Sequence, residues 1–139
     1  MKIVLDTNVL VSALLSPYGP PARLLDLILL DKLTPLYDDR ILHEYRQVLL
    51  RERFGFEPLA IEALLQYVEL VGTKVVASPL AKHQTAPDPE DLMFLEVAVA
   101  GQAEAVITGN VRHFPAAIRH GIRVVEPAAF LAQRQATSS

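Results

Sequence analysis

The chain begins with Met1-Lys2-Ile3-Val4-Leu5 and continues directly into Asp6-Thr7-Asn8. A short apolar run without helical periodicity predicts a buried strand, with the Asp6 carboxylate at its carboxyl end. Open α/β sheets bind ligands in the crevice outside the carboxyl ends of their strands. Asp6 is therefore placed either for chemistry or for capping a helix that begins near Asn8, a common role for aspartate.

The composition predicts a single domain with a large apolar core. Of the 139 residues, 51% are hydrophobic and 21% are charged. No apolar run reaches the roughly 18 residues that a membrane crossing needs. Met1 leads directly into a strand, so we expect no signal peptide. We expect one domain over residues 1–135, followed by a frayed tail at 136–139.

Cysteine is absent, which excludes disulfide bonds and thiolate metal sites and fits a cytoplasmic protein without a membrane partner. The net charge of −3 and the pI near 5.8 argue against nucleic-acid binding through overall charge. A local basic patch remains compatible with these values.

Strands and helices alternate along the chain. Apolar runs predict strands at 1–5, 33–37, 74–77, 105–108 and 122–125. Helical spacing, helix caps and prolines predict helices at 8–15, 21–29, 58–70, 90–100 and 115–119. A further helix is capped by Asp38 or Asp39 and runs to about residue 53, and a terminal helix starts at 127. This alternation is typical of a parallel sheet covered by helices on both faces.

A parallel sheet brings polar residues from distant segments to one edge. Asp6 and Asn110 each follow a strand, Asp91 opens a helix at that edge, and Glu44 lies one to two turns into another helix. Clustered carboxylates repel one another unless a cation compensates. Oxygen ligands without cysteine favour Mg²⁺ or Mn²⁺, which can activate water for attack on a phosphodiester. The sequence therefore points to phosphodiester cleavage.

These residues carry a resemblance to a known family. The chain resembles the PIN domain, and more closely the stand-alone bacterial PIN proteins regarded as toxins of toxin–antitoxin systems. The matching pieces are Leu5-Asp6-Thr7-Asn8-Val9-Leu10-Val11-Ser12, His43-Glu44-Tyr45, Asp88-Pro89-Glu90-Asp91 with Phe94-Leu95-Glu96, and Ile107-Thr108-Gly109-Asn110 with His113-Phe114-Pro115. In this order and spacing they form a specific pattern that spans nearly the whole chain.

The resemblance implies a three-layer α/β/α sandwich with a mostly parallel sheet of about five strands, and a metal-dependent ribonuclease site. It assigns the acidic ligands to Asp6, Glu44 and Asp91, the neighbouring hydroxyl to Thr108, and supporting positions to Asn8 and Ser12. Asn110 stands where many PIN domains have a fourth acid, which lowers the negative charge of the site by one. Asp88 is a further candidate ligand that would compensate for this loss.

Each assignment has a structural alternative. Asp91 would stabilise a helix dipole, Glu44 would lie on a solvated surface beside Arg46, and Asp88 would serve the turn before Pro89. Glu96 is more consistent with a helix surface or a support than with a ligand, and His43 with a hydrogen-bonded support.

Basic residues accumulate after Ala105, where Glu126 is the only acid. Arg112 and His113 leave the same edge as Asn110, so we expect them to bind substrate, and Arg40 and Arg46 could flank Glu44 similarly. The alternative is ordinary solubilising charge.

Three functions remain open. The first is a Mg²⁺- or Mn²⁺-dependent endoribonuclease held inactive by a small antitoxin, with a homodimer as its expected assembly. The second is a catalytically weak PIN fold that binds RNA or a protein, which Asn110 favours. The third is an aspartyl-phosphate phosphotransferase, which is disfavoured because Asn8 stands where a second aspartate is usual.

Overall fold

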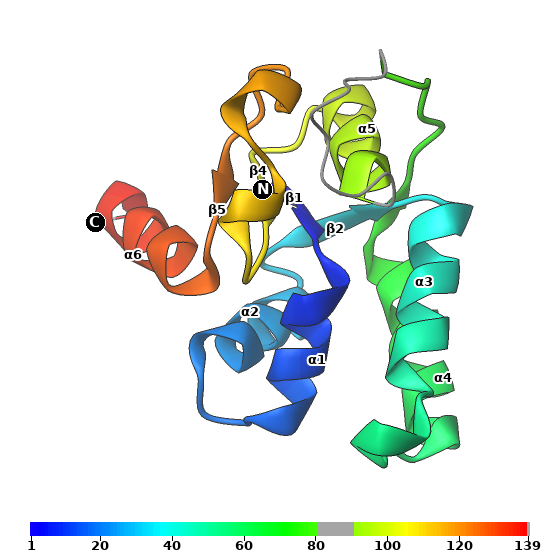
Figure 1. Cartoon of the computed structure of the whole chain (residues 1–139). Coiled ribbons are helices and arrows are strands. Elements are labelled where there is room, and N and C mark those ends of the chain that lie inside the picture. Colours follow the sequence, from blue (N-terminus) through cyan, green and yellow to red (C-terminus); the bar gives the residue numbers. More distant parts are fainter. Residues whose placement is uncertain (81–90, 139) are drawn as a thin grey trace.

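A five-stranded parallel sheet forms the centre of the molecule in this computed structural model, which describes residues 1–80 and 91–138 (Figure 1). The strand order is β3-β2-β1-β4-β5. The strands are β1 (Lys2–Leu5), β2 (Thr34–Tyr37), β3 (Thr73–Lys74), β4 (Ala105–Ile107) and β5 (Val124–Val125). The first strand of the chain is therefore the middle strand of the sheet.

Helices cover both faces of this sheet, as the alternating pattern predicts. They are α1 (Thr7–Leu15), α2 (Pro20–Leu29), α3 (Asp39–Leu49), α4 (Pro58–Val71), α5 (Leu92–Gly101) and α6 (Pro127–Ser138), with short 3-10 helices η1 (Glu52–Phe54), η3 (Val111–His113) and η4 (Ala116–Ile118). Helix α5 packs across β1, β2 and β4, whereas α2 packs between α1 and α6 (Figure 1). The three-layer α/β/α prediction is confirmed.

Burial of β1 explains why the sheet forms around it. Ile3, Val4 and Leu5 are buried, and they pair with β2 on one side and with β4 on the other. A strand that is buried on both faces needs a continuous apolar run, which is what the N-terminus supplies. None of the helices in the described part of the chain combines the length and apolar character that a membrane crossing requires.

Two predicted elements differ from the structure. Helix α3 ends at Leu49 instead of near Arg53, because the chain turns through η1 and Gly55 adopts a left-handed conformation at φ 66°. The strand predicted at 74–77 is β3, which stops at Lys74 because its partner β2 ends at Tyr37. Val76 is then 94% exposed. The other boundaries within the described residues shift by at most two positions.

Candidate active site

Asp6 stands where β1 passes into α1, and the backbone fixes it there. Its N–H donates to the carbonyl of Ile107 at 2.9 Å, which extends the pairing of β1 with β4 by one residue. Asp6 is the N-cap of α1, yet its side chain makes no capping hydrogen bond. The backbone of Thr7 and Asn8 nevertheless interacts with this carboxyl group and lowers its pKa, so the start of α1 remains part of its surroundings.

Hydrogen bonds from neighbouring residues orient the Asp6 carboxylate. Thr108 donates its hydroxyl to Asp6 Oδ2 at 2.8 Å, and the Asn8 amide lies 3.4 Å from the same oxygen. Thr108 Oγ1 in turn accepts from the Asn110 N–H at 3.0 Å. The Gly109 N–H donates to Asn8 Oδ1 at 3.1 Å, so the loop after β4 and the start of α1 hold each other.

Burial makes ionisation of Asp6 costly. The residue is only 7% exposed, and this desolvation raises the pKa of its carboxyl above the ordinary value. Hydrogen bonds from Thr108 and the backbone, together with the nearby His113, oppose that rise in pKa. A carboxylate held in low-dielectric surroundings is stabilised by any cation that approaches it.

Helix α3 brings Glu44 to the same place. Thr7, the first residue of α1, donates its hydroxyl to Glu44 Oε2. The adjacent Tyr45 is buried and donates to the Leu5 carbonyl at 2.6 Å, which ties α3 to the end of β1. Because Thr7 follows Asp6 directly, its hydrogen bond places the carboxylate of Glu44 at the Asp6 edge.

Asp91 reaches this edge from the N-terminus of α5. It is 8% exposed, and its side chain makes no capping hydrogen bond at this helix end. His113 Nδ1 lies 3.6 Å from Asp91 Oδ2, while His113 Nε2 lies 2.8 Å from the Asn110 side-chain amide. When the imidazole is neutral, an amide that donates to Nε2 leaves the ring hydrogen on Nδ1, facing Asp91.

A cavity of about 500 Å³ unites these side chains. Its lining consists of Asp6, Thr7, Asn8, Val11, Ser12, Glu44, Val48, Arg51, Arg53, Phe54, Asp91 and His113. A smaller cavity of about 210 Å³ adjoins it, sharing Glu44, Val48 and Arg51 and adding His43 on its far side. Glu44 therefore lies between two hollows on one surface.

The remaining predicted site residues lie around this cavity. Thr108 is buried behind Asp6, and Asn110 is half-buried beside His113, outside the cavity lining. Arg112 is exposed and also lies outside the lining. Asp88 lies outside the described residues.

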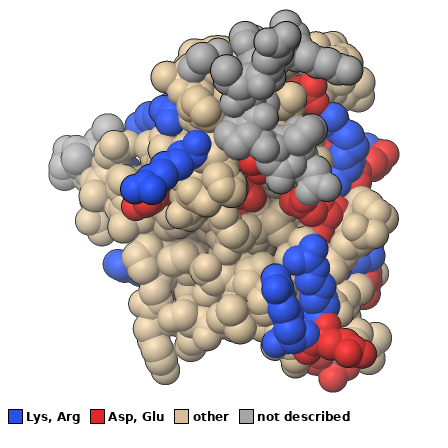
Figure 2. Space-filling model, in the orientation of Figure 1, with Lys and Arg blue, Asp and Glu red and all other residues tan. Residues whose placement is uncertain are grey.

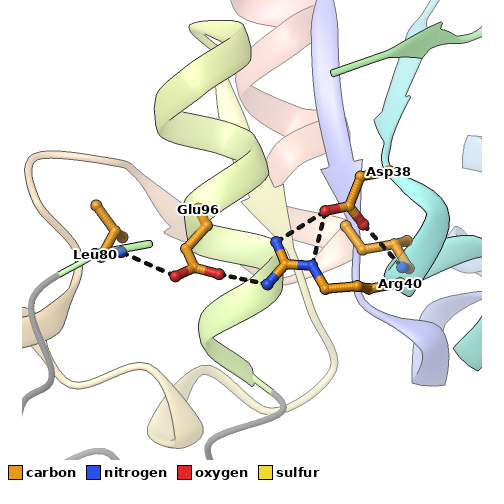
Figure 3. Close-up of polar contacts among 5 residues, drawn as sticks. Asp38, Arg40, Leu80 and Glu96 are labelled. Carbon is orange, nitrogen blue, oxygen red and sulfur yellow. Dashed lines mark hydrogen bonds and ion pairs between the residues drawn. The ribbon is translucent and has the colours of Figure 1, made fainter. Parts of the chain in front are cut away.

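Two arginines expected to flank Glu44 have other partners. Arg46 forms an ion pair with Glu62 on α4 at 2.9 Å. Arg40 forms ion pairs with Asp38 at 2.8 Å and with Glu96 at 2.7 Å (Figure 3). Both guanidinium groups are engaged because α3 packs between α4 and α5.

Glu96 is buried, contrary to the surface alternative. Its second carboxylate oxygen accepts from the Leu80 N–H at 2.9 Å, so Glu96 links three segments of the chain (Figure 3). The support alternative describes it better, because α3 and α5 also carry Glu44 and Asp91.

Sequence reasoning missed Arg51, Arg53 and Phe54, which form one wall of the larger cavity. Glu44, Val48 and Arg51 follow one another at helical spacing, although α3 ends at Leu49 and Arg51 lies just beyond it. That spacing was available in the sequence for Arg51. For Arg53 and Phe54 no periodic signal exists, because they lie in the turn after α3.

The donor chemistry of the cavity fits a hard divalent cation, since its titratable oxygen ligands are the carboxylates of Asp6, Glu44 and Asp91. Across residues 1–80 and 91–138, no group of three or more His, Cys, Asp or Glu side chains is close enough to hold a metal ion.

Comparison with known proteins agrees with this arrangement. The family model of the PIN domain matches residues 2–112. The chain is also 32% identical over 114 residues to the uncharacterized protein MJ1680 of Methanocaldococcus jannaschii, covering 79% of this chain and 71% of that protein. The matched segment contains the parallel sheet up to β4 and all three cavity carboxylates. This chain therefore belongs to the PIN domain family, whose fold is a nuclease fold.

Proposed function

We propose that this protein is a metal-dependent endoribonuclease and the toxin of a toxin–antitoxin pair. One observation carries the nuclease proposal: carboxylates from three separate segments, Asp6, Glu44 and Asp91, line a single cavity at the carboxyl edge of the sheet. Such an arrangement concentrates negative charge where open α/β sheets bind ligands. A divalent cation is the partner that would offset this charge.

In this proposal Asp6, Glu44 and Asp91 hold Mg²⁺ or Mn²⁺, with Asp88 as a further ligand. The bound cation supplies an activated water and neutralises charge on the phosphoryl oxygen. Asp6 is kept in position by Thr108 and by Asn8, while Ser12 contributes to the opposite wall of the cavity.

The loop after β4 positions the substrate side of the site. The Asn110 amide orients the His113 imidazole, and that ring faces Asp91 across 3.6 Å. His113 can donate a hydrogen bond to a phosphate oxygen when its Nδ1 carries the hydrogen. Arg112 directly precedes His113 on the same short helix and is exposed, which leaves it available for a more distant phosphate.

The test is RNA cleavage by the purified protein with Mn²⁺, with Mg²⁺ and with EDTA. We expect cleavage with either cation, and a fall of about a thousandfold in EDTA or in Asp91→Asn, because several kcal/mol of transition-state stabilisation are lost. Asp26→Asn is the matched control, since Asp26 is an exposed carboxylate on α2 outside the cavity. Cleavage that persists in EDTA would exclude the metal-dependent mechanism.

A catalytically weak binding module is the second candidate. Asn110, at the position of a fourth acid, favours it. So does the finding that, among the described residues, no group of three or more His, Cys, Asp or Glu side chains could hold a metal ion. RNA binding that is independent of cations and is not followed by cleavage would establish this function in place of the first.

The toxin proposal rests on the resemblance to stand-alone PIN proteins. Leu59 and Leu70 on α4 are each 78% exposed, which offers apolar surface to a small antitoxin or to a second copy in a homodimer. We expect induced expression to arrest cell growth and co-expression of the adjacent gene to restore it. Arrest by Asp6→Asn as strong as that by the native chain would separate toxicity from cleavage.

A further inference from the structure

Two arginines face the carboxylates from the η1 side of the cavity. Arg51 and Arg53 are exposed and line the same cavity as Asp6, Glu44 and Asp91. Among residues 1–80 and 91–138 neither forms an ion pair, unlike Arg40 and Arg46 of the preceding helix α3. Figure 2 shows basic side chains gathered at the η1 end of α3, on a face that also carries acidic side chains.

The backbone holds this end of α3 in a tight turn. The Phe54 N–H donates to the Arg51 carbonyl at 3.1 Å, and the Gly55 N–H donates to the Glu52 carbonyl at 3.0 Å. Gly55 takes φ 66°, a left-handed conformation that residues with a Cβ rarely adopt. The two arginines therefore project from a short, internally hydrogen-bonded segment.

Aromatic contacts orient Arg53 further. Its guanidinium lies over the Phe54 ring, 4.8 Å from the ring centre, and the Phe54 ring stacks on Phe56 at 5.6 Å with an interplanar angle of 15°. A guanidinium that rests its face on a ring keeps its N–H donors in the plane, where they can bind an anion. Within the part of the chain that the structure describes, Arg53 therefore has this ring contact and no ion pair.

The charges that line the cavity indicate which kind of ligand the two guanidinium groups would bind. A phosphodiester that enters the cavity without a cation meets three carboxylates, and their negative charge repels it. Arg51 and Arg53 supply two positive charges on the same wall, and guanidinium groups match the geometry of phosphate oxygens. We propose that Arg51 and Arg53 form a phosphate-binding site that holds the backbone of a single nucleic-acid strand next to the carboxylates.

The proposed strand runs through the cavity from η1, past Glu44, to His113, all of which contribute to its lining. The phosphates on the η1 side contact Arg51 and Arg53, and the phosphate to be cleaved lies between them and His113. This inference rests on the proposed function, because it assigns substrate contacts to that site. Phosphate recognition of this kind is shared by RNA and DNA, so the experiment must distinguish them.

Binding is measured in EDTA by fluorescence anisotropy with the Asp6→Asn chain, so that cleavage plays no part. The probes are labelled oligouridylate and oligodeoxythymidylate of about ten nucleotides, and a duplex of equal length. We expect Arg51→Gln and Arg53→Gln each to weaken single-strand binding about fivefold, and the pair about thirtyfold. The slope of log affinity against log salt should become shallower by about 1.4.

Two variants control this experiment. Arg23→Gln removes an exposed arginine of α2 that lines a separate cavity, and it should leave the affinity and the salt slope unchanged. Phe54→Leu keeps an apolar side chain but removes the ring beneath Arg53, and it should weaken binding about twofold.

Equal loss in Arg23→Gln and in the arginine pair would overturn the proposal, since general charge would then explain binding. Unchanged affinity in the pair would also overturn it, even if the native chain cleaves RNA. If the arginine pair specifically loses strand binding while the native chain never cleaves RNA, the phosphate-binding site would stand and the nuclease proposal would be rejected. Equal binding of RNA and DNA supports a backbone contact, and tighter binding of duplex than of single strands contradicts it.

Discussion

Asp6→Asn is expected to lower RNA cleavage about a thousandfold and, at the same time, to make the protein more stable. The loss of activity follows if Asp6 is a metal ligand, because an amide lacks the charge that binds a hard cation and stabilises the reaction several kcal/mol less. Asn is close in shape to Asp and can still accept the Thr108 hydrogen bond through its carbonyl oxygen. The fold around residue 6 should therefore be retained.

The gain in stability follows from the raised pKa of Asp6, whose largest cause is burial. Where both the folded and the unfolded chain carry the charge, the folded chain alone bears its desolvation cost. As pH falls through the raised pKa, the folded chain binds the proton first, so this cost disappears toward the unfolded value near 3.9. We expect Asp6→Asn to add about 1 kcal/mol to the free energy of unfolding at pH 7.

Urea unfolding of the metal-free native chain and of Asp6→Asn, at neutral pH and at mildly acidic pH, measures this effect. The difference between the two chains should shrink as the pH is lowered. A difference that stays constant with pH would show that ionisation of Asp6 is not its cause. A variant that is both inactive and less stable would instead indicate that Asp6 serves the fold.

Arg40→Ala is expected to lower the free energy of unfolding by about 3 kcal/mol, the low end for breaking a buried ion pair. The side chain of Glu96 is 9% exposed, and Arg40 supplies the cation next to it (Figure 3). Without Arg40, the buried Glu96 carboxylate still accepts the hydrogen bond from the Leu80 N–H, but it no longer has a positive charge beside it. The estimate stays at the low end because Arg40 itself is half-exposed.

Arg46→Ala is the matched control for this change. Arg46 lies on the same helix as Arg40 and forms an ion pair of similar length with Glu62 of α4, but the two side chains are 37% and 39% exposed. Surface pairs contribute about 0 to 1 kcal/mol, so the control should change stability little. Equal effects of the two substitutions would show that burial of Glu96 is not what makes the Arg40 pair important.

A second substitution tests the same point from the other partner. In the Arg40→Ala background, Glu96→Gln removes the uncompensated charge, so it should recover part of the lost stability. Failure to recover any would indicate that Arg40 acts through Asp38, the N-cap of α3, with which it also pairs. Thermal or urea unfolding of the four chains completes this cycle.

The alternation of apolar runs and helical periods was sufficient to predict the architecture. A parallel sheet follows from that alternation because each crossover helix returns the chain to the same edge. The lengths of individual strands and helices were less predictable. The run at 74–77 has strand-like residues, yet hydrogen bonds need a partner, and β2 ends too early to supply one.

The site around Asp6 likewise has features that the sequence predicts and features that it does not. That Asp6, Glu44 and Asp91 share one edge depends only on strand direction and helix starts, which local sequence patterns specify. That Arg40 pairs with Glu96, that Asn110 turns to His113, and that Arg53 lies over Phe54 depend on helix rotation and on turns.

The sequence by itself therefore determined the order of elements, the parallel sheet and the position of Asp6 at its carboxyl edge. Only the tertiary structure decided which arginines are engaged in ion pairs and which face the carboxylates. The physical reason is range: periodicity and caps act within one element, whereas an ion pair between α3 and α5 depends on how separate elements pack.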